Sequence, residues 1–229
     1  MFYQDIPTLI QRIVIPGFFT TIYMLFIATI TCTCFGSLLA IILTVTDEKG
    51  LKPNRLIYGI LSSLINIVRS TPFVITMISI IPLTRLVVGK AIGPNAAIFA
   101  ITIAASPLVA RLLEGSLKEV NTGLIESAKS FGASDFQIIV HVLIHESIPS
   151  IVSNLTLAII SILGYTAMAG IVGAGGLGAV ALTYGYQNFN DTIMYSTVFI
   201  LVIFVQIIQY LGLLIYRKLK WYISKYILW

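Results

Sequence analysis

The chain has 229 residues, of which 58% are hydrophobic and only 10% are charged, and its mean hydropathy is +0.98. A water-soluble globule of this size needs more charged side chains to cover its surface, so the composition excludes that class and indicates an integral membrane protein. The net charge of +5 does not predict a nucleic-acid partner, because the 14 Lys and Arg lie in short clusters between apolar runs.

Apolar runs predict an all-α, polytopic fold that forms one transmembrane domain over residues 1–229. A helix of about 20 apolar residues crosses the roughly 30 Å hydrocarbon core and pairs its own backbone amides. The residues before the first run lack the basic start and short apolar core of a cleavable signal, so we expect that run to be its own anchor. The five expected spans are residues 18–45, 72–88, 95–113, 149–169 and 192–216, and a polar loop covers 114–147.

The segment between the first two spans is amphipathic. Residues 55–85 would make one helix of 31 residues, about 46 Å long, which is too long for a bilayer. The run RSTP at 69–72 predicts a break, because proline disfavours helical geometry at the residue before it. Ser62, Asn66 and Arg69 form a polar stripe on the helix before that break. That helix either lies along the membrane surface or continues into the second span.

The third span ends at Arg111 and Glu114, whose spacing of three predicts an ion pair at the water boundary. Five spans place the two termini on opposite sides of the membrane. With the C-terminus in the cytoplasm, eleven Lys and Arg, including Arg69, fall on the inner side and three fall outside, as the positive-inside rule requires. We therefore expect a multi-pass protein of the cytoplasmic membrane with its N-terminus outside and the polar loop in the cytoplasm.

The polar loop contains the stretch ESAKSFGASDFQ, for which local rules predict a helix, a glycine corner and a second short helix. Thr122 or Gly123 is expected to cap the first helix. Gly132 suits the left-handed position that ends it, where any side chain would clash. Ser134 and Gln137 have the spacing of a capping box at the start of the second helix.

The same loop has too much apolar character for a solvated connection. Its apolar side chains either fold back onto the bundle or fill a groove of a soluble partner. They are Leu124, Ile125, Ala128, Phe131, Phe136, Ile138 and Ile139.

The run ESAKSFGASDFQIIVHVLIHESIP resembles the cytoplasmic EAA loop of permease subunits in bacterial ABC importers. Glu126, Ala128 and Gly132 match that motif in register, and Ser127 stands at the second motif position, where alanine is usual. His145 occupies the place of the proline that closes the motif.

Three further segments, NIVRSTPFVI, PLTRLVVG and GYTAMAGIVGAGGLGAVALTYGY, are similar to permeases of methionine-uptake ABC importers. The resemblance covers nearly the whole chain and implies the type I importer permease fold. It also implies a homodimer of permeases in membrane lipid, two ATP-binding subunits and an extracytoplasmic substrate-binding lipoprotein. The sequence has no G-x-x-x-x-G-K-[ST] loop, so we expect ATP and Mg to bind to the partner ATPase and this chain to be a non-catalytic subunit without a cofactor.

The resemblance also assigns functional residues. The set expected to couple the permease to its ATPase is Glu126, Ala128, Phe131, Gly132, Ser134 and Phe136. For the solute path, which takes methionine as D- or L-isomer, the candidates are Tyr165 and Met168, beside the glycine-rich segment of that resemblance. Arg69 is a third candidate on its own residues, because it ends the polar stripe beside the predicted helix break. A lipid-headgroup anchor is the alternative for Arg69, and interhelical packing is the alternative for the other two.

The alternatives within transport are importers for phosphonate, taurine or another amino acid, and outside transport a membrane scaffold. An intramembrane enzyme would need paired catalytic groups, which the spans lack.

GAGGLG at 173–178 spells a dinucleotide fingerprint without the strand and helix that give it meaning; close packing or a flexible connector is expected instead. His141 and His145 have zinc-ligand spacing but no obvious third ligand, so a metal site is not expected there. Cys32 and Cys34 point about 200° apart on a helix, so they cannot share a metal or a disulfide.

Overall fold

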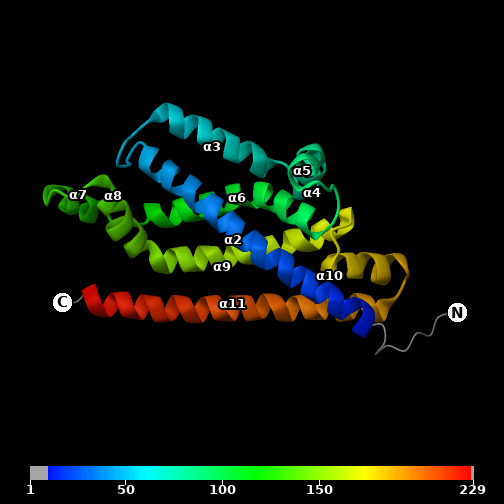
Figure 1. Cartoon of the computed structure of the whole chain (residues 1–229). Helices are drawn as coiled ribbons and strands as arrows, with labels where there is room; N and C mark the ends of the chain where they lie inside the picture. The colour runs from blue at the N-terminus through cyan, green and yellow to red at the C-terminus, as the bar shows by residue number, and fades with distance from the viewer. Residues whose placement is uncertain (1–9, 228–229) are drawn as a thin grey trace.

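The computed structural model describes residues 10–227, with side chains described as far as Trp221. Over these residues the chain is helical throughout, which confirms the all-α fold (Figure 1). Residues 1–9, on which the expectations about a leader and an outer N-terminus depend, lie outside the described part. Four long helices form the bundle: α2 (Ile15–Thr46), α6 (Pro94–Lys118), α9 (His145–Ala169) and α11 (Asp191–Ile227).

Helices α2 and α6 form the centre of the bundle and approach each other closely. A stripe of small residues at spacing four, Ala28, Cys32, Gly36 and Ala40, is buried along α2. A Cβ on Gly36 would lie 2.6 Å from the side chain of Val109 on α6, so only glycine permits this separation. Cys32 is therefore a buried packing residue, while Cys34 is exposed and both thiols are free.

The structure corrects the expectation of one continuous helix over 72–88. This segment forms two short helices, α4 (Phe73–Ser79) and α5 (Ile81–Val88). Pro82 lies in the first turn of α5, and its ring excludes the carbonyl that a continuous helix would place four residues earlier. The longer of the two has 8 residues, about 12 Å of helix, so neither crosses a bilayer alone.

Helix α3 (Arg55–Ser70) precedes this pair and runs beside α2 and α6 (Figure 1). With 16 residues it is a candidate for the second crossing only together with α4. Ser62 and Asn66, in the polar stripe of α3, contact Arg111 on α6. Helix α3 packs on α2 and α6 through Leu61 and Ile65, while Asn66 and Arg69 of the stripe are exposed. Its exposed apolar residues are Leu56, Ile57, Ile60, Leu64 and Ile67.

Within residues 10–227, four helices are long and apolar enough to cross a membrane, and the pair α3–α4, bent by 105°, makes a fifth candidate. Arg55 begins α3 and Arg69 lies in its last turn, next to α4, so the two arginines are at opposite ends of this helix. The charge count that put both on the inner side is therefore wrong for Arg69, although the strong excess at the other end is preserved.

The two ends of the bundle carry different structures (Figure 1). The α7 end holds α7 (Thr122–Ser130) and α8 (Asp135–Gln137), and the α10 end holds α4, α5 and α10 (Gly176–Ala179). The glycine-rich run folds back at the α10 end, where a Cβ on Gly178 would lie 2.0 Å from the backbone of Ala167 in α9. These glycines therefore serve close packing rather than a flexible connection.

Candidate coupling site and solute cavity

Helix α7 begins and ends with side-chain and backbone caps. The Asn121 carboxamide oxygen accepts from the backbone N–H of Gly123 at 2.8 Å, so the cap is Asn121 and not the predicted Thr122 or Gly123. At the other end Gly132 has a φ of 79°. The N–H of Gly132 donates to Lys129 at 2.9 Å, and the N–H of Ala133 donates to the carbonyl of Ala128 at 3.1 Å. This pair of bonds is a Schellman motif, which confirms the predicted glycine corner.

The predicted capping box follows the corner. The N–H of Ser134 donates to the Gln137 side-chain oxygen at 2.8 Å, and the N–H of Gln137 donates to the Ser134 hydroxyl at 3.3 Å. The expectation of a second short helix is wrong, because α8 continues through the π-helical η2 (Ile138–Ile144) into α9 as one helix of 38 residues, Asp135–Val172. The backbone N–H of His145 donates to the carbonyl of Val142, a bond that a proline at this position could not make. The helix therefore continues through His145.

The apolar side chains of the corner divide into an inward and an outward set. Ile138 is fully buried, and Ile125 and Ile139 pack against the core. Phe131 and Phe136 are 92% and 73% exposed, on either side of Gly132. The reading that the set folds back onto the bundle therefore holds for the inward part, whereas Phe131 and Phe136 are exposed in the described part of the chain.

The corner is attached to the turn that joins α2 to α3. Asp135, the first residue of α8, forms an ion pair of 3.0 Å with Lys52. The turn itself is fixed onto the end of α2, since the N–H groups of Lys52 and Asn54 donate to the carbonyls of Val45 and Thr46 at 2.9 Å. The corner is therefore linked to α2 through a short turn that backbone hydrogen bonds hold in place, and not through a flexible loop.

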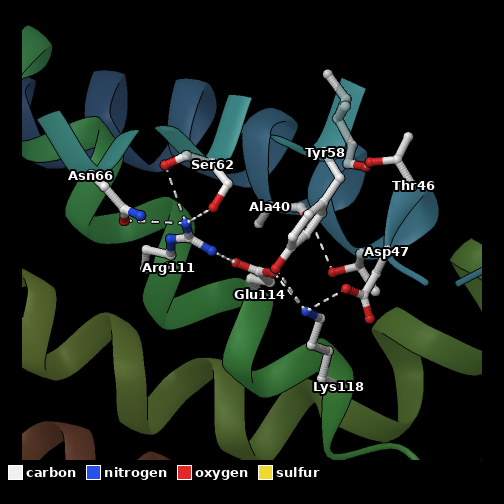
Figure 2. A network of polar contacts seen from close by, with 11 residues as sticks. Ala40, Thr46, Asp47, Tyr58, Ser62, Asn66, Arg111, Glu114 and Lys118 are labelled. Carbon is white, nitrogen blue, oxygen red and sulfur yellow. Dashed lines mark hydrogen bonds and ion pairs between the residues drawn. The ribbon is translucent and has the colours of Figure 1, made fainter. Parts of the chain in front are cut away.

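A buried carboxylate lies next to this turn (Figure 2). Glu114 is 3% exposed and forms ion pairs with Arg111 at 2.8 Å and Lys118 at 2.7 Å. The Tyr58 hydroxyl donates to the same carboxylate at 3.1 Å. The predicted pair of Arg111 and Glu114 is therefore present, but Glu114 is buried between α3 and α6 rather than placed at the water boundary.

The two cations extend this cluster in opposite directions (Figure 2). Arg111 donates to Asn66 at 3.2 Å and to the hydroxyl of Ser62, both on α3. Lys118 pairs with Asp47, the residue that follows α2, at 3.3 Å. The cluster thus joins α2, α3 and α6 through charged groups. We call Asp47, Tyr58, Arg111, Glu114 and Lys118 the ionic hub.

A second polar feature lies at the α10 end, where a cavity of about 170 Å³ opens between α3, α4, α6 and α9. Arg69 and Tyr165 both line it, as the sequence grouping suggested, together with Phe73 and Thr76. The rings of Phe73 and Tyr165 stack with centroids 4.4 Å apart and an angle of 11° between their planes. Met168 is 44% exposed and does not line this cavity, so the structure does not group it with the other two.

The two histidines after the corner are both exposed on one helix. The Nδ1 atom of His141 lies 3.3 Å from the carbonyl oxygen of Gln137. Within the described residues, no group of three or more His, Cys, Asp and Glu side chains is placed to hold a metal ion.

A helical membrane bundle with an exposed, doubly capped corner at one end is the architecture of a transporter permease subunit. The chain belongs to the family of binding-protein-dependent transport system inner membrane components, which matches residues 33–221.

Several relatives are similar in sequence over most of the chain. The chain is 46% identical over 198 residues to the probable D-methionine transport system permease protein MetI of Vibrio cholerae, covering 86% of this chain and 88% of that one. It is 45% identical over 175 residues to the methionine import system permease protein MetP of Bacillus subtilis, with 76% and 78% covered. A solved inward-facing structure of the MetNI methionine ABC transporter superposes with a TM-score of 0.89 at 37% identity, covering 96% of this chain and 99% of that chain.

Proposed function

We propose that this chain is the membrane-spanning permease subunit of an ATP-driven importer for methionine. The observation that carries the proposal is the match to a MetNI methionine transporter over 96% of the chain, combined with the corner at Gly132. The relatives' names supply the solute, and the corner supplies a contact through which an ATPase can act. Because the chain brings no phosphate-binding loop, hydrolysis is assigned to a partner subunit.

In the assembly that we propose, two copies of this chain pair in the membrane. Each presents its α7 end to one ATPase subunit in the cytoplasm, and each presents its α10 end to a substrate-binding protein outside. The concentration of Lys and Arg at the α7 end supports this orientation. The set Glu126, Ala128, Phe131, Gly132, Ser134 and Phe136 then lies at the ATPase contact.

The corner gives this contact a mechanical consequence. Phe131 and Phe136 project from it, while the chain after Gly132 continues as one helix of 38 residues into the bundle. ATP-driven closure of the ATPase pair would displace the corner, and the long helix would carry that displacement across the membrane. Rigid elements that pivot at short hinges are a common way for domains to convert between two states.

The function is tested with the purified complex of permease and ATPase in liposomes, with the binding protein added on one side. Labelled L-methionine, D-methionine, taurine and a phosphonate are supplied separately. We expect methionine to accumulate only with hydrolysable ATP and binding protein, and an ATP analogue that is not hydrolysed is the control. Accumulation of another solute in place of methionine, or uptake that is independent of ATP, would overturn the assignment.

The cavity at the α10 end is proposed as part of the solute path. Its guanidinium group at Arg69 suits a carboxylate, and the stacked rings of Phe73 and Tyr165 offer an apolar wall for a thioether side chain. Arg69→Met and Tyr165→Ala should each lower methionine uptake about tenfold, since a charge-assisted hydrogen bond or an aromatic contact is worth roughly 1.4 kcal/mol or more.

The matched control for the cavity is Arg85→Met, which removes an exposed arginine from α5 at the same end. Uptake rates are divided by the amount of assembled complex. If Arg69→Met lowers assembly but leaves uptake per complex at the wild-type rate, Arg69 is a lipid anchor and the path assignment fails. Met168→Ala is expected to have little effect, because its side chain is outside the cavity.

A further inference from the structure

The ionic hub is an unusual feature of a membrane bundle, because it places a carboxylate and two cations between packed helices. Glu114 is 3% exposed, and the side chains of Arg111 and Lys118 are 19% and 36% exposed. Removing charges from water is costly, and apolar residues of similar volume often give equal or greater stability. Stability alone therefore does not account for this cluster.

The position of the hub indicates what it does. One side is reached from the corner: Asp135 pairs with Lys52, the turn after α2 carries Lys52 and Asp47, and Asp47 pairs with Lys118. The other side reaches α3, because Arg111 donates to Ser62 and Asn66. Every link in this series is a hydrogen bond, an ion pair or a short piece of backbone.

The series ends near the solute cavity. Asn66 lies three residues before Arg69 on α3, so the two are neighbours on one helix face. A rigid helix that is held at Asn66 by the hub carries Arg69 with it. The hub thus stands between the proposed ATPase contact and the proposed solute path, at the junction of α2, α3 and α6 (Figure 2).

Resting on the proposed function, we infer that Glu114, with Arg111 and Lys118, is a positioning group that makes α3 follow the coupling corner during transport. Directional ion pairs and hydrogen bonds hold the turn after α2, the end of α6 and the middle of α3 in one register. Apolar contacts of the same volume would allow these elements to slide past each other, because such contacts have no preferred direction. The hub therefore secures the transmission of movement rather than the fold.

The inference is tested by replacing the charged groups together. Arg111→Met, Glu114→Leu and Lys118→Met are combined in one variant, so that no buried charge is left without a partner. The number of solute molecules imported per ATP hydrolysed is measured in liposomes, with thermal unfolding and ATPase assembly measured on the same preparation. We expect the variant to unfold within a few degrees of wild type and to bind the ATPase, yet to import at least fivefold fewer molecules per ATP.

A second variant tests the same route without touching the buried groups. Lys52→Gln and Asp47→Asn together remove two partly exposed ion pairs, whose loss costs little stability. This variant should also lower the number of molecules imported per ATP, and its result decides the matter if the triple variant does not fold. The control is Glu48→Gln, which breaks the exposed pair of Glu48 with Arg55 in the same turn.

The outcomes separate the inference from the proposed function. If wild-type complex imports methionine and both variants import it with the wild-type yield per ATP, the hub is only structural and the inference is wrong. If wild-type complex itself fails to import methionine, the function is wrong. The single variant Lys118→Arg keeps the positive charge next to Glu114. A wild-type number of molecules imported per ATP in this variant, beside a lowered number in the triple variant, would support positioning by the ion pair.

Discussion

Gly132→Val is expected to abolish ATP-coupled methionine uptake while the bundle stays folded. Gly132 has a φ of 79°, and a Cβ built there meets nothing within 4 Å. The effect of valine is therefore conformational strain, about 1–2 kcal/mol or more for a branched side chain in the left-handed region. Helix α7 has no buried residue, so the chain relieves the strain most cheaply by turning α7 out of place. Uptake and ATP hydrolysis are measured together in liposomes.

A matched control exists at the opposite end of the bundle. Gly89 has a φ of 78° and also has no neighbour within 4 Å of its missing Cβ. Gly89→Val therefore introduces similar strain outside the proposed contact, and we expect it to retain coupled uptake. Full uptake by Gly132→Val, or equal loss in both variants, would contradict the role of the corner as the joint between permease and ATPase.

The features of the corner that the sequence predicts correctly are local. A glycine in the left-handed position and a serine three residues before glutamine act within one turn of helix, so neighbouring residues decide the outcome. The first cap is Asn121 rather than the predicted Thr122 or Gly123, because Asn121 and Thr122 are adjacent and either side chain can accept from the first turn. Hydropathy likewise predicts four long apolar helices that are present among the described residues, since length and apolar content are also local quantities.

The placement of α3 and the ionic hub depend on contacts that are distant in the sequence. A 16-residue amphipathic helix such as α3 is read as a surface helix until the face that meets the bundle is known. The partners of Arg111 and Lys118 lie on α3 and after α2, more than 40 residues away in the sequence. Only the spacing of Arg111, Glu114 and Lys118 within one helix gave a local signal, and it predicted a single surface pair.

Phe131→Ala is expected to weaken binding of the ATPase subunit roughly 30-fold, because a buried aromatic anchor at an interface contributes about 2 kcal/mol or more. Phe131 is 92% exposed in the isolated chain. Its removal therefore leaves no cavity and should not change the thermal unfolding of the permease. Phe136→Ala should have a smaller effect in the same direction, since that ring is less exposed. Binding is measured by titrating detergent-solubilised permease with purified ATPase.

Phe189→Ala is the matched control, because Phe189 is 91% exposed and precedes α11 at the α10 end. Equal exposure at the two sites means that a general loss of apolar surface would affect both variants alike, through aggregation or detergent binding. If the ATPase binds at the α7 end, only Phe131→Ala should weaken its binding. If Phe131→Ala and Phe136→Ala both leave ATPase binding unchanged, the outward aromatic residues of the corner do not fill the ATPase groove. The coupling contact must then lie elsewhere on that end of the bundle.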